Sequence, residues 1–169
     1  MTIPDSVTYI GECAFCGCTN LKKIVVPDSV TSIGGSTFYG CTSLTEITIP
    51  DSVTNIWSST FRGCSSLTEI TIPDSVTSIG DSAFYGCTSL TEVTIPDGVT
   101  NIEGFVFTNT PWLIAKQEEN PLVIINGTLI DATTCTGSVT IPDGVTSIAG
   151  GAFDSCTAVS YTHLTLPTT

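Results

Sequence analysis

The sequence is poor in positive charge and in histidine. Its 169 residues contain 4 Lys and Arg, 16 Asp and Glu and 1 His, which gives a formal net charge of −12. Nucleic acids and anionic membranes are bound through Lys and Arg that neutralise phosphates, so neither is expected as a partner. A single histidine and scattered carboxylates also offer little for acid–base catalysis. We therefore expect a protein that is not an enzyme and uses no cofactor.

Long apolar runs are also missing. No stretch approaches the roughly 18 consecutive apolar residues of a membrane span, and the first residues lack the basic start and apolar core of a signal peptide. Charged residues are only 12% of the chain, and the polar complement consists instead of 30 Thr and 18 Ser. The sequence therefore predicts no membrane insertion and a surface made largely of hydroxyl groups.

A repeat of 23 residues organises most of the chain. Proline, phenylalanine, cysteine and leucine each recur at this step and form columns when the units are aligned. These columns are Pro4, Pro27, Pro50, Pro73, Pro96 and Pro142; Phe15, Phe38, Phe61, Phe84, Phe107 and Phe153; Cys18, Cys41, Cys64, Cys87 and Cys156; and Leu21, Leu44, Leu67, Leu90 and Leu113. The length corresponds to about seven such units.

Each unit predicts two short strands and a closing turn. In residues 44–49, branched and polar residues alternate, which indicates a half-buried strand with Glu46 and Thr48 facing outward. The Pro-Asp pair that follows predicts a turn, because proline fixes φ and aspartate bonds to its own backbone. A second extended stretch is expected at 53–56, and a helical or 3₁₀ turn around Phe61. The aspartate that recurs in each Pro-Asp turn is expected to bond to the backbone of that turn rather than to bind a row of calcium ions along the stack.

One unit cannot bury its own apolar face. Its six large apolar residues contribute roughly 9–18 kcal/mol when buried, whereas ordering 23 backbone units costs about 1–2 kcal/mol each. Stability must therefore come from stacking, with each strand pairing in parallel with its neighbour at about 4.8 Å. Identical residues should then form ladders through the stack.

The pattern L-x-x-I-x-I-P-x-x-V-x-x-I-x-x-x-x-F-x-G-C, from Leu44 to Cys64, resembles the leucine-rich repeat, and its Pro-Asp turn and Phe-x-Gly-Cys close resemble the BspA-like subfamily. The resemblance covers Thr2 to about Thr157. It implies a β-rich α/β fold: a leucine-rich-repeat solenoid, a curved right-handed superhelix of parallel strands with short 3₁₀ or helical turns. It further implies a secreted or cell-surface protein that binds other proteins and has no catalytic, cofactor or metal residues.

Residues 108–140 keep the length of the repeat but lose its residue types. Thr110 and Pro111 predict the start of a short helix that ends near Glu119. Asn126-Gly127 predicts a type I′ hairpin turn, which we favour over use of the same residues as a glycosylation site. The apolar residues expected to cover the flank of the solenoid here are Trp112, Leu113, Leu122 and Ile130.

The predicted solenoid occupies residues 1–157. Residues 158–169 depart from the repeat and resemble translated adapter sequence, which would make them an artefact. Neither end carries the capping repeat that a solenoid needs. We therefore expect a monomeric segment of a longer chain.

The cysteines are expected to serve packing. One thiol per unit occupies an inward position and suits a reduced core, with disulfide pairing as the alternative. Cys13 and Cys16 have metal-ligand spacing, but no second pair or histidine accompanies them, so packing or surface thiols are favoured over zinc. Cys135 is expected to be buried in the variant segment.

Two sets of exposed side chains are candidates for contact with a partner protein of host, matrix or surface origin. The first is the outward ladder of the strands, and the second follows the buried phenylalanines. The two sets are Glu46, Thr48, Glu69, Thr71, Glu92 and Thr94, and Tyr39, Arg62 and Tyr85. Three alternatives remain open. The exposed side chains could serve only to keep the protein soluble, or the segment could be a structural spacer that displays adjacent domains. The threonine ladder could also bind ice, which the glutamates between the threonines disfavour.

Overall fold

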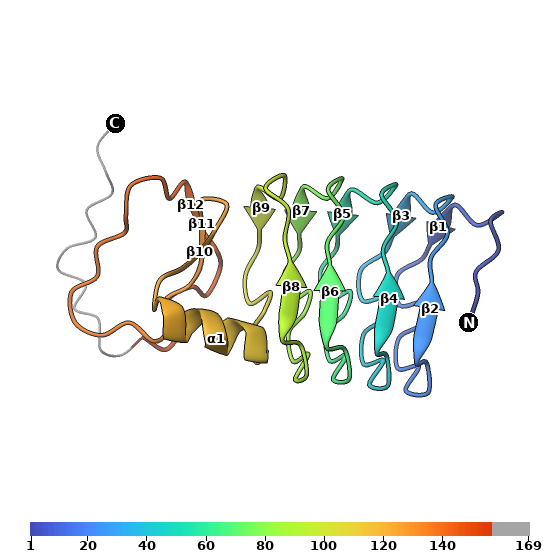
Figure 1. Ribbon diagram of the computed structural model, residues 1–169, viewed down its shortest axis with the longest axis horizontal. Helices are drawn as coiled ribbons and strands as arrows, with labels where there is room; N and C mark the ends of the chain where they lie inside the picture. Colours follow the sequence, from blue (N-terminus) through green and yellow to red (C-terminus); the bar gives the residue numbers. More distant parts are fainter. Residues whose placement is uncertain (157–169) are drawn as a thin grey trace.

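The computed structural model describes residues 1–156, which form a stack of coils with short parallel strands on two walls (Figure 1). The front wall contains β2 (Lys23–Val25), β4 (Glu46–Thr48), β6 (Glu69–Thr71) and β8 (Glu92–Thr94). The back wall contains β1 (Tyr9–Ile10), β3 (Ser32–Ile33), β5 (Asn55–Ile56), β7 (Ser78–Ile79) and β9 (Asn101–Ile102). The predicted tail, 158–169, lies outside the described residues.

Strand pairing follows the 23-residue step. On the front wall Lys23 lies opposite Glu46 and Glu69 opposite Glu92, in parallel register. The central residue of β2, β4 and β6 is buried and its two neighbours are exposed. The alternation predicted for these strands is therefore confirmed. The Pro-Asp turn is confirmed as well, since the Val53 N–H donates to the Pro50 carbonyl at 3.0 Å.

The third side of each coil, which we call the turn wall, differs from the prediction of a helical or 3₁₀ turn. It is a run of tight turns, because Ser59 and Gly63 have φ values of 57° and 74° and interrupt any right-handed helix. Alternate N–H groups point along the stack instead, as when Phe61 donates to the Ala83 carbonyl at 2.8 Å. The positive-φ corner recurs at Cys13, Ser36, Ser59, Ser82, Phe105 and Gly151. These six corners give about six coils within residues 1–156, whereas about seven units were predicted for the full length.

A phenylalanine ladder runs through the core. The rings from Phe15 to Phe107 stack in sequence with centroids 5.3–5.5 Å apart and planes within 9° of parallel. The rings of Phe38, Phe61 and Phe84 are fully buried, whereas Phe15 in the first coil is only partly covered. The predicted stacking of identical residues is thus confirmed.

The cysteine column is buried in most coils. Cys41, Cys64 and Cys87 are fully buried, and each thiol donates to the carbonyl of a phenylalanine in the preceding coil, as Cys64 does to Phe38 at 3.2 Å. Cys156 and Cys135 are also buried. The prediction was wrong for Cys18, which is exposed because it lies in the first coil and no earlier coil covers it.

The variant segment folds as the sequence predicts. Helix α1 (Pro111–Glu119) is capped by Thr110, whose hydroxyl accepts from the Leu113 N–H at 3.1 Å. The Trp112 indole lies 4.5 Å from the Phe107 ring at a tilt of 50° and ends the aromatic ladder. Trp112 and Leu113 are buried in the main core, so α1 covers its flank.

A hairpin follows α1. Strands β10 (Val123–Ile125) and β11 (Thr128–Asp131) are antiparallel, and β11 pairs in parallel with β12 (Ser147–Ile148). Asn126 and Gly127 both have positive φ, as a type I′ turn requires. The Asn126 amide donates to the carbonyls of Pro96 and Val99, both at 2.9 Å, and so ties the hairpin to the preceding coil.

The variant segment also divides the core. Ile130 packs against the main cluster, whereas Leu122 packs against a smaller second cluster that includes Leu129, Ala152 and Cys156. The four residues predicted to cover the flank are therefore buried or partly buried, but they serve two clusters rather than one.

Candidate functional site

The strands that carry the first predicted set, β4, β6 and β8, lie on the front wall (Figure 1). Glu46, Glu69 and Glu92 are exposed, and a threonine two residues later in each strand is exposed beside them. The strands position these side chains because every second residue points away from the core. Repeated stacking then turns one exposed glutamate and threonine per coil into a ladder.

The charge of this face is uneven. Lys23 forms an ion pair with Glu46, and both side chains are more than half exposed. Glu69 lies directly opposite Glu92 with no such cation, which costs about 1 kcal/mol or less between exposed charges in water. The negative potential of the face is therefore carried mainly by Glu69 and Glu92, which favours a basic or hydroxyl-rich partner.

The second predicted set lies on the turn wall. Tyr39 is exposed, whereas Arg62 and Tyr85 are partly buried, with the Arg62 guanidinium carbon 4.4 Å from the centroid of the Tyr85 ring. This contact holds Arg62 in place by a cation–π interaction. The structure does not bring the two sets together, so they are alternative surfaces.

A groove between β4 and β6 was not predicted. It has a volume of about 350 Å³, and its lining includes Glu46, Glu69 and Asp51 above a floor of Ile47 and Ile70. Trp57, which stands where three other coils have glycine and is 51% exposed, follows β5 and is not among the residues that line the groove.

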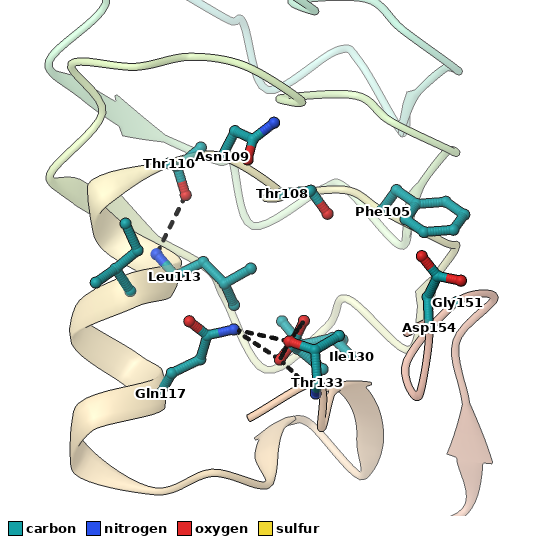
Figure 2. Close-up of a pocket in the computed structure, with 12 residues that line it drawn as sticks. Phe105, Thr108, Asn109, Thr110, Leu113, Gln117, Ile130, Thr133, Gly151 and Asp154 are labelled. Atoms are coloured by element: carbon teal, nitrogen blue, oxygen red, sulfur yellow. Dashed lines mark hydrogen bonds between the residues drawn. The ribbon is translucent and has the colours of Figure 1, made fainter. Parts of the chain in front are cut away.

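A second cavity, of about 210 Å³, lies between α1 and the last coils (Figure 2). The Gln117 amide donates to the Asp131 carboxylate at 2.8 Å, and the same carboxylate accepts from the Thr133 backbone N–H at 3.1 Å. Asp131 is thus a buried carboxylate with its acceptors in use, and this network joins α1 to β11. Phe105 and Gly151 also line the cavity, and the Phe105 ring packs so closely on Gly151 that a side chain there would overlap it.

The thiols show no reactive arrangement in the core. Burial raises the pKa of Cys41 to about 11 and that of Cys87 to about 12, and it also raises the pKa of Cys64. All eight cysteines are free, and Cys13 and Cys16 are exposed. Within residues 1–156, no three His, Cys, Asp or Glu side chains gather as metal ligands would.

Comparison with known proteins supports the architecture. A family model described as a BspA type leucine rich repeat region matches residues 1–114 and 123–169 in six copies. A leucine-rich repeat protein of T. pallidum is similar over 94% of this chain and 66% of its own, with 29% identity and a TM-score of 0.66. A leucine rich cell surface protein of Faecalibacterium prausnitzii is 32% identical over 94% of this chain and 45% of its own, with a TM-score of 0.54.

A leucine-rich repeat protein of Bacteroides ovatus is also similar, with 27% identity over 94% of this chain and a TM-score of 0.54. This chain spans 55% of that protein and less than two thirds of the other two. No curated protein matches the chain significantly. In the described part of the chain, no helix has the length and apolar character needed to cross a membrane.

Proposed function

The chain belongs to the BspA-type leucine-rich repeat family, and from this premise we propose that it is a non-catalytic protein-binding segment of a secreted or cell-surface protein. We assign the solenoid to residues 1–157, with residues 108–140 as a variant repeat. Leucine-rich repeats generally mediate protein interactions, and one of the similar structures is a cell surface protein. Adhesion to host or matrix proteins is the function that we propose for the segment.

The observation that carries this proposal is the exposed ladder on the front wall. Glu69 and Glu92 lie in parallel register over a buried core, and Glu46 holds the same place in β4, which pairs with β2, so the backbone that carries the three glutamates is ordered before any partner arrives. A pre-organised surface loses little conformational freedom on binding. Its charge also favours rapid association with a basic partner.

A binding panel tests the front wall directly. Immobilised fibronectin, laminin and collagen would be titrated with the chain and with a variant carrying Glu46→Gln, Glu69→Gln and Glu92→Gln. We expect at least one panel protein to bind and the variant to bind it at least tenfold more weakly, because three charged contacts are lost. Surface plasmon resonance at two salt concentrations measures the affinities.

The matched control changes the same amount of charge elsewhere. Asp5, Asp28 and Asp97 are exposed at the Pro-Asp turns, and their replacement by asparagine should leave the affinity within twofold. Equal weakening by both triple variants would indicate net charge rather than the front wall. No binding to any panel protein would reject matrix adhesion and favour the spacer function.

A further inference from the structure

Two exposed cysteines of the first coil lie at the two ends of one tight turn. The Cys16 N–H donates to the Cys13 carbonyl at 3.0 Å, which closes a β-turn with cysteine at its first and fourth positions. In a β-turn the α-carbons of these positions lie within about 7 Å of each other. A disulfide spans α-carbons that are about 4.4–6.8 Å apart. The turn therefore brings the two cysteines to a distance that a disulfide can bridge.

The two side chains also approach each other. The pKa of the Cys13 thiol is raised, first by partial desolvation and next by the charge of the Cys16 thiol and a hydrogen bond with it. A hydrogen bond between two side chains acts only at short range. The two sulfur atoms therefore lie on the same side of the turn, where they can meet without a change in the backbone.

Backbone bonds to the second coil hold this turn in place. The N–H groups of Cys13, Phe15 and Gly17 donate to carbonyl groups of that coil at 2.7–3.1 Å. The turn is thus ordered while both thiols are free. Groups that are held close together react with each other as if they were highly concentrated.

The same turn recurs along the turn wall, but no other unit has cysteine at either position. In the third coil the Arg62 N–H donates to the Ser59 carbonyl at 3.1 Å, as Cys16 does to Cys13. Tyr39 occupies the column of Cys16 and is 43% exposed although a coil precedes it. The exposure of this column therefore does not depend on a place in the first coil.

The other thiols of the ladder are less suited to exchange. Cys41, Cys64 and Cys87 are fully buried and donate to backbone carbonyls, whereas exchange with a disulfide requires an accessible thiolate. Cys18 is exposed, but its counterpart in the next coil, Cys41, is buried. The turn of the first coil is thus the place where two accessible thiols meet.

We propose that Cys13 and Cys16 are a dithiol that small disulfide compounds, such as oxidised glutathione, convert into an intramolecular disulfide. One cysteine thiolate attacks a sulfur of the small disulfide, which forms a mixed disulfide and releases the first small thiol. The second cysteine thiolate attacks the protein sulfur of the mixed disulfide, closes the Cys13–Cys16 bond and releases the second small thiol. The two cysteines give up two electrons and two protons, and the small disulfide is reduced to two thiols.

The second step distinguishes this pair from thiols that are merely exposed. Because the turn holds the partner thiol close, the mixed disulfide at Cys13 or Cys16 is resolved before it accumulates. Cys18 has no such partner and keeps the glutathione that it acquires. The products differ in mass, since an internal disulfide removes two hydrogens and a mixed disulfide adds a glutathionyl group.

The test is thiol–disulfide exchange of the reduced chain in a mixture of oxidised and reduced glutathione. The samples would be quenched with acid, alkylated at their remaining thiols, digested with trypsin and analysed by mass spectrometry. Trypsin cleaves after Lys22 and Arg62, so residues 1–22 carry three cysteines and Cys41 lies in a different peptide. We expect peptide 1–22 mainly with an internal disulfide, at least tenfold more abundant than glutathione adducts at the two turn cysteines.

Two serine variants separate the pair from the third thiol. Cys13→Ser should stop the reaction at the mixed disulfide, so that Cys16 retains at least tenfold more glutathione than in the unmodified chain. This variant should fold, because serine occupies the same position in the next coil, as Ser36. Cys18→Ser is the matched control, since it removes another exposed thiol of the same peptide and should form the internal disulfide within twofold of the unmodified chain.

Three outcomes would overturn the dithiol proposal. The first is glutathione retained at Cys13 and Cys16 in the unmodified chain to the level seen in Cys13→Ser, which would mean that the two thiols do not meet. The second is loss of the internal disulfide in Cys18→Ser, and the third is a cross-link between peptide 1–22 and the peptide that contains Cys41. Circular dichroism of each variant before exchange checks that its fold is retained.

Discussion

Replacing Phe61 with alanine is expected to lower the free energy of unfolding by about 3–5 kcal/mol, the usual loss for a fully buried aromatic residue. Phe61 contributes to two stacked contacts, with Phe38 and with Phe84, and both are lost together. Urea unfolding followed by circular dichroism measures the change. The loss should be large because a repeat protein depends on contacts between neighbouring coils.

Phe15 provides the matched comparison. It has only one ring neighbour in the ladder and is partly exposed, so Phe15→Ala should cost less than half as much as Phe61→Ala. Equal losses at the two positions would mean that the ladder is not the main stabilising contact. A loss confined to the coils next to Phe61 would instead show that they unfold independently of the rest.

Raising the pH from 8 to 10 is expected to lower the stability of the chain by about 4 kcal/mol through three buried thiols. In the unfolded chain a thiol ionises near pH 9.0, whereas burial raises the pKa of Cys41 to about 11 and of Cys87 to about 12. The pKa of Cys64 is raised as well. Above pH 9 the unfolded chain therefore releases protons that the folded chain retains, and unfolding becomes easier.

The measurement is urea unfolding at pH 8, 9 and 10 under reducing conditions. A variant with Cys41→Ser, Cys64→Ser and Cys87→Ser keeps a donor to the same carbonyls and cannot ionise in this range. Its stability, whatever its value at pH 8, should fall by less than about 1 kcal/mol over the same interval. Parallel decline of the two proteins would assign the effect to groups other than these three thiols, such as Cys135, whose pKa burial also raises.

The sequence predicted the regular coils well because each column has one packing role repeated many times. The inward Ile47, the turn at Pro50 and the buried Phe61 follow from alternation, proline chemistry and periodicity. The variant segment was also predictable, since Thr110-Pro111 and Asn126-Gly127 are strong local signals.

The features that the sequence did not predict depend on contacts between coils. The positive φ of Ser59 has no residue signal, because serine occupies that conformation only where neighbouring coils bond to the turn wall. The exposure of Cys18 reflects its place in the first coil rather than its column. The absence of backbone pairing between β4 and β6 depends on how two coils meet, and neither unit carries a sequence signal for it.

The central claim is that the partner protein binds to the front wall, and chemical labelling of the carboxyl groups tests it most directly. The chain would be labelled by carbodiimide and glycine ethyl ester, alone and bound to the panel protein it recognises, and each site quantified by mass spectrometry. The account predicts that Glu69 and Glu92 are protected in the complex, whereas Asp28 and Asp97 at the turns are labelled equally in both samples. Protection of the turn aspartates with unchanged labelling of the two glutamates would contradict it.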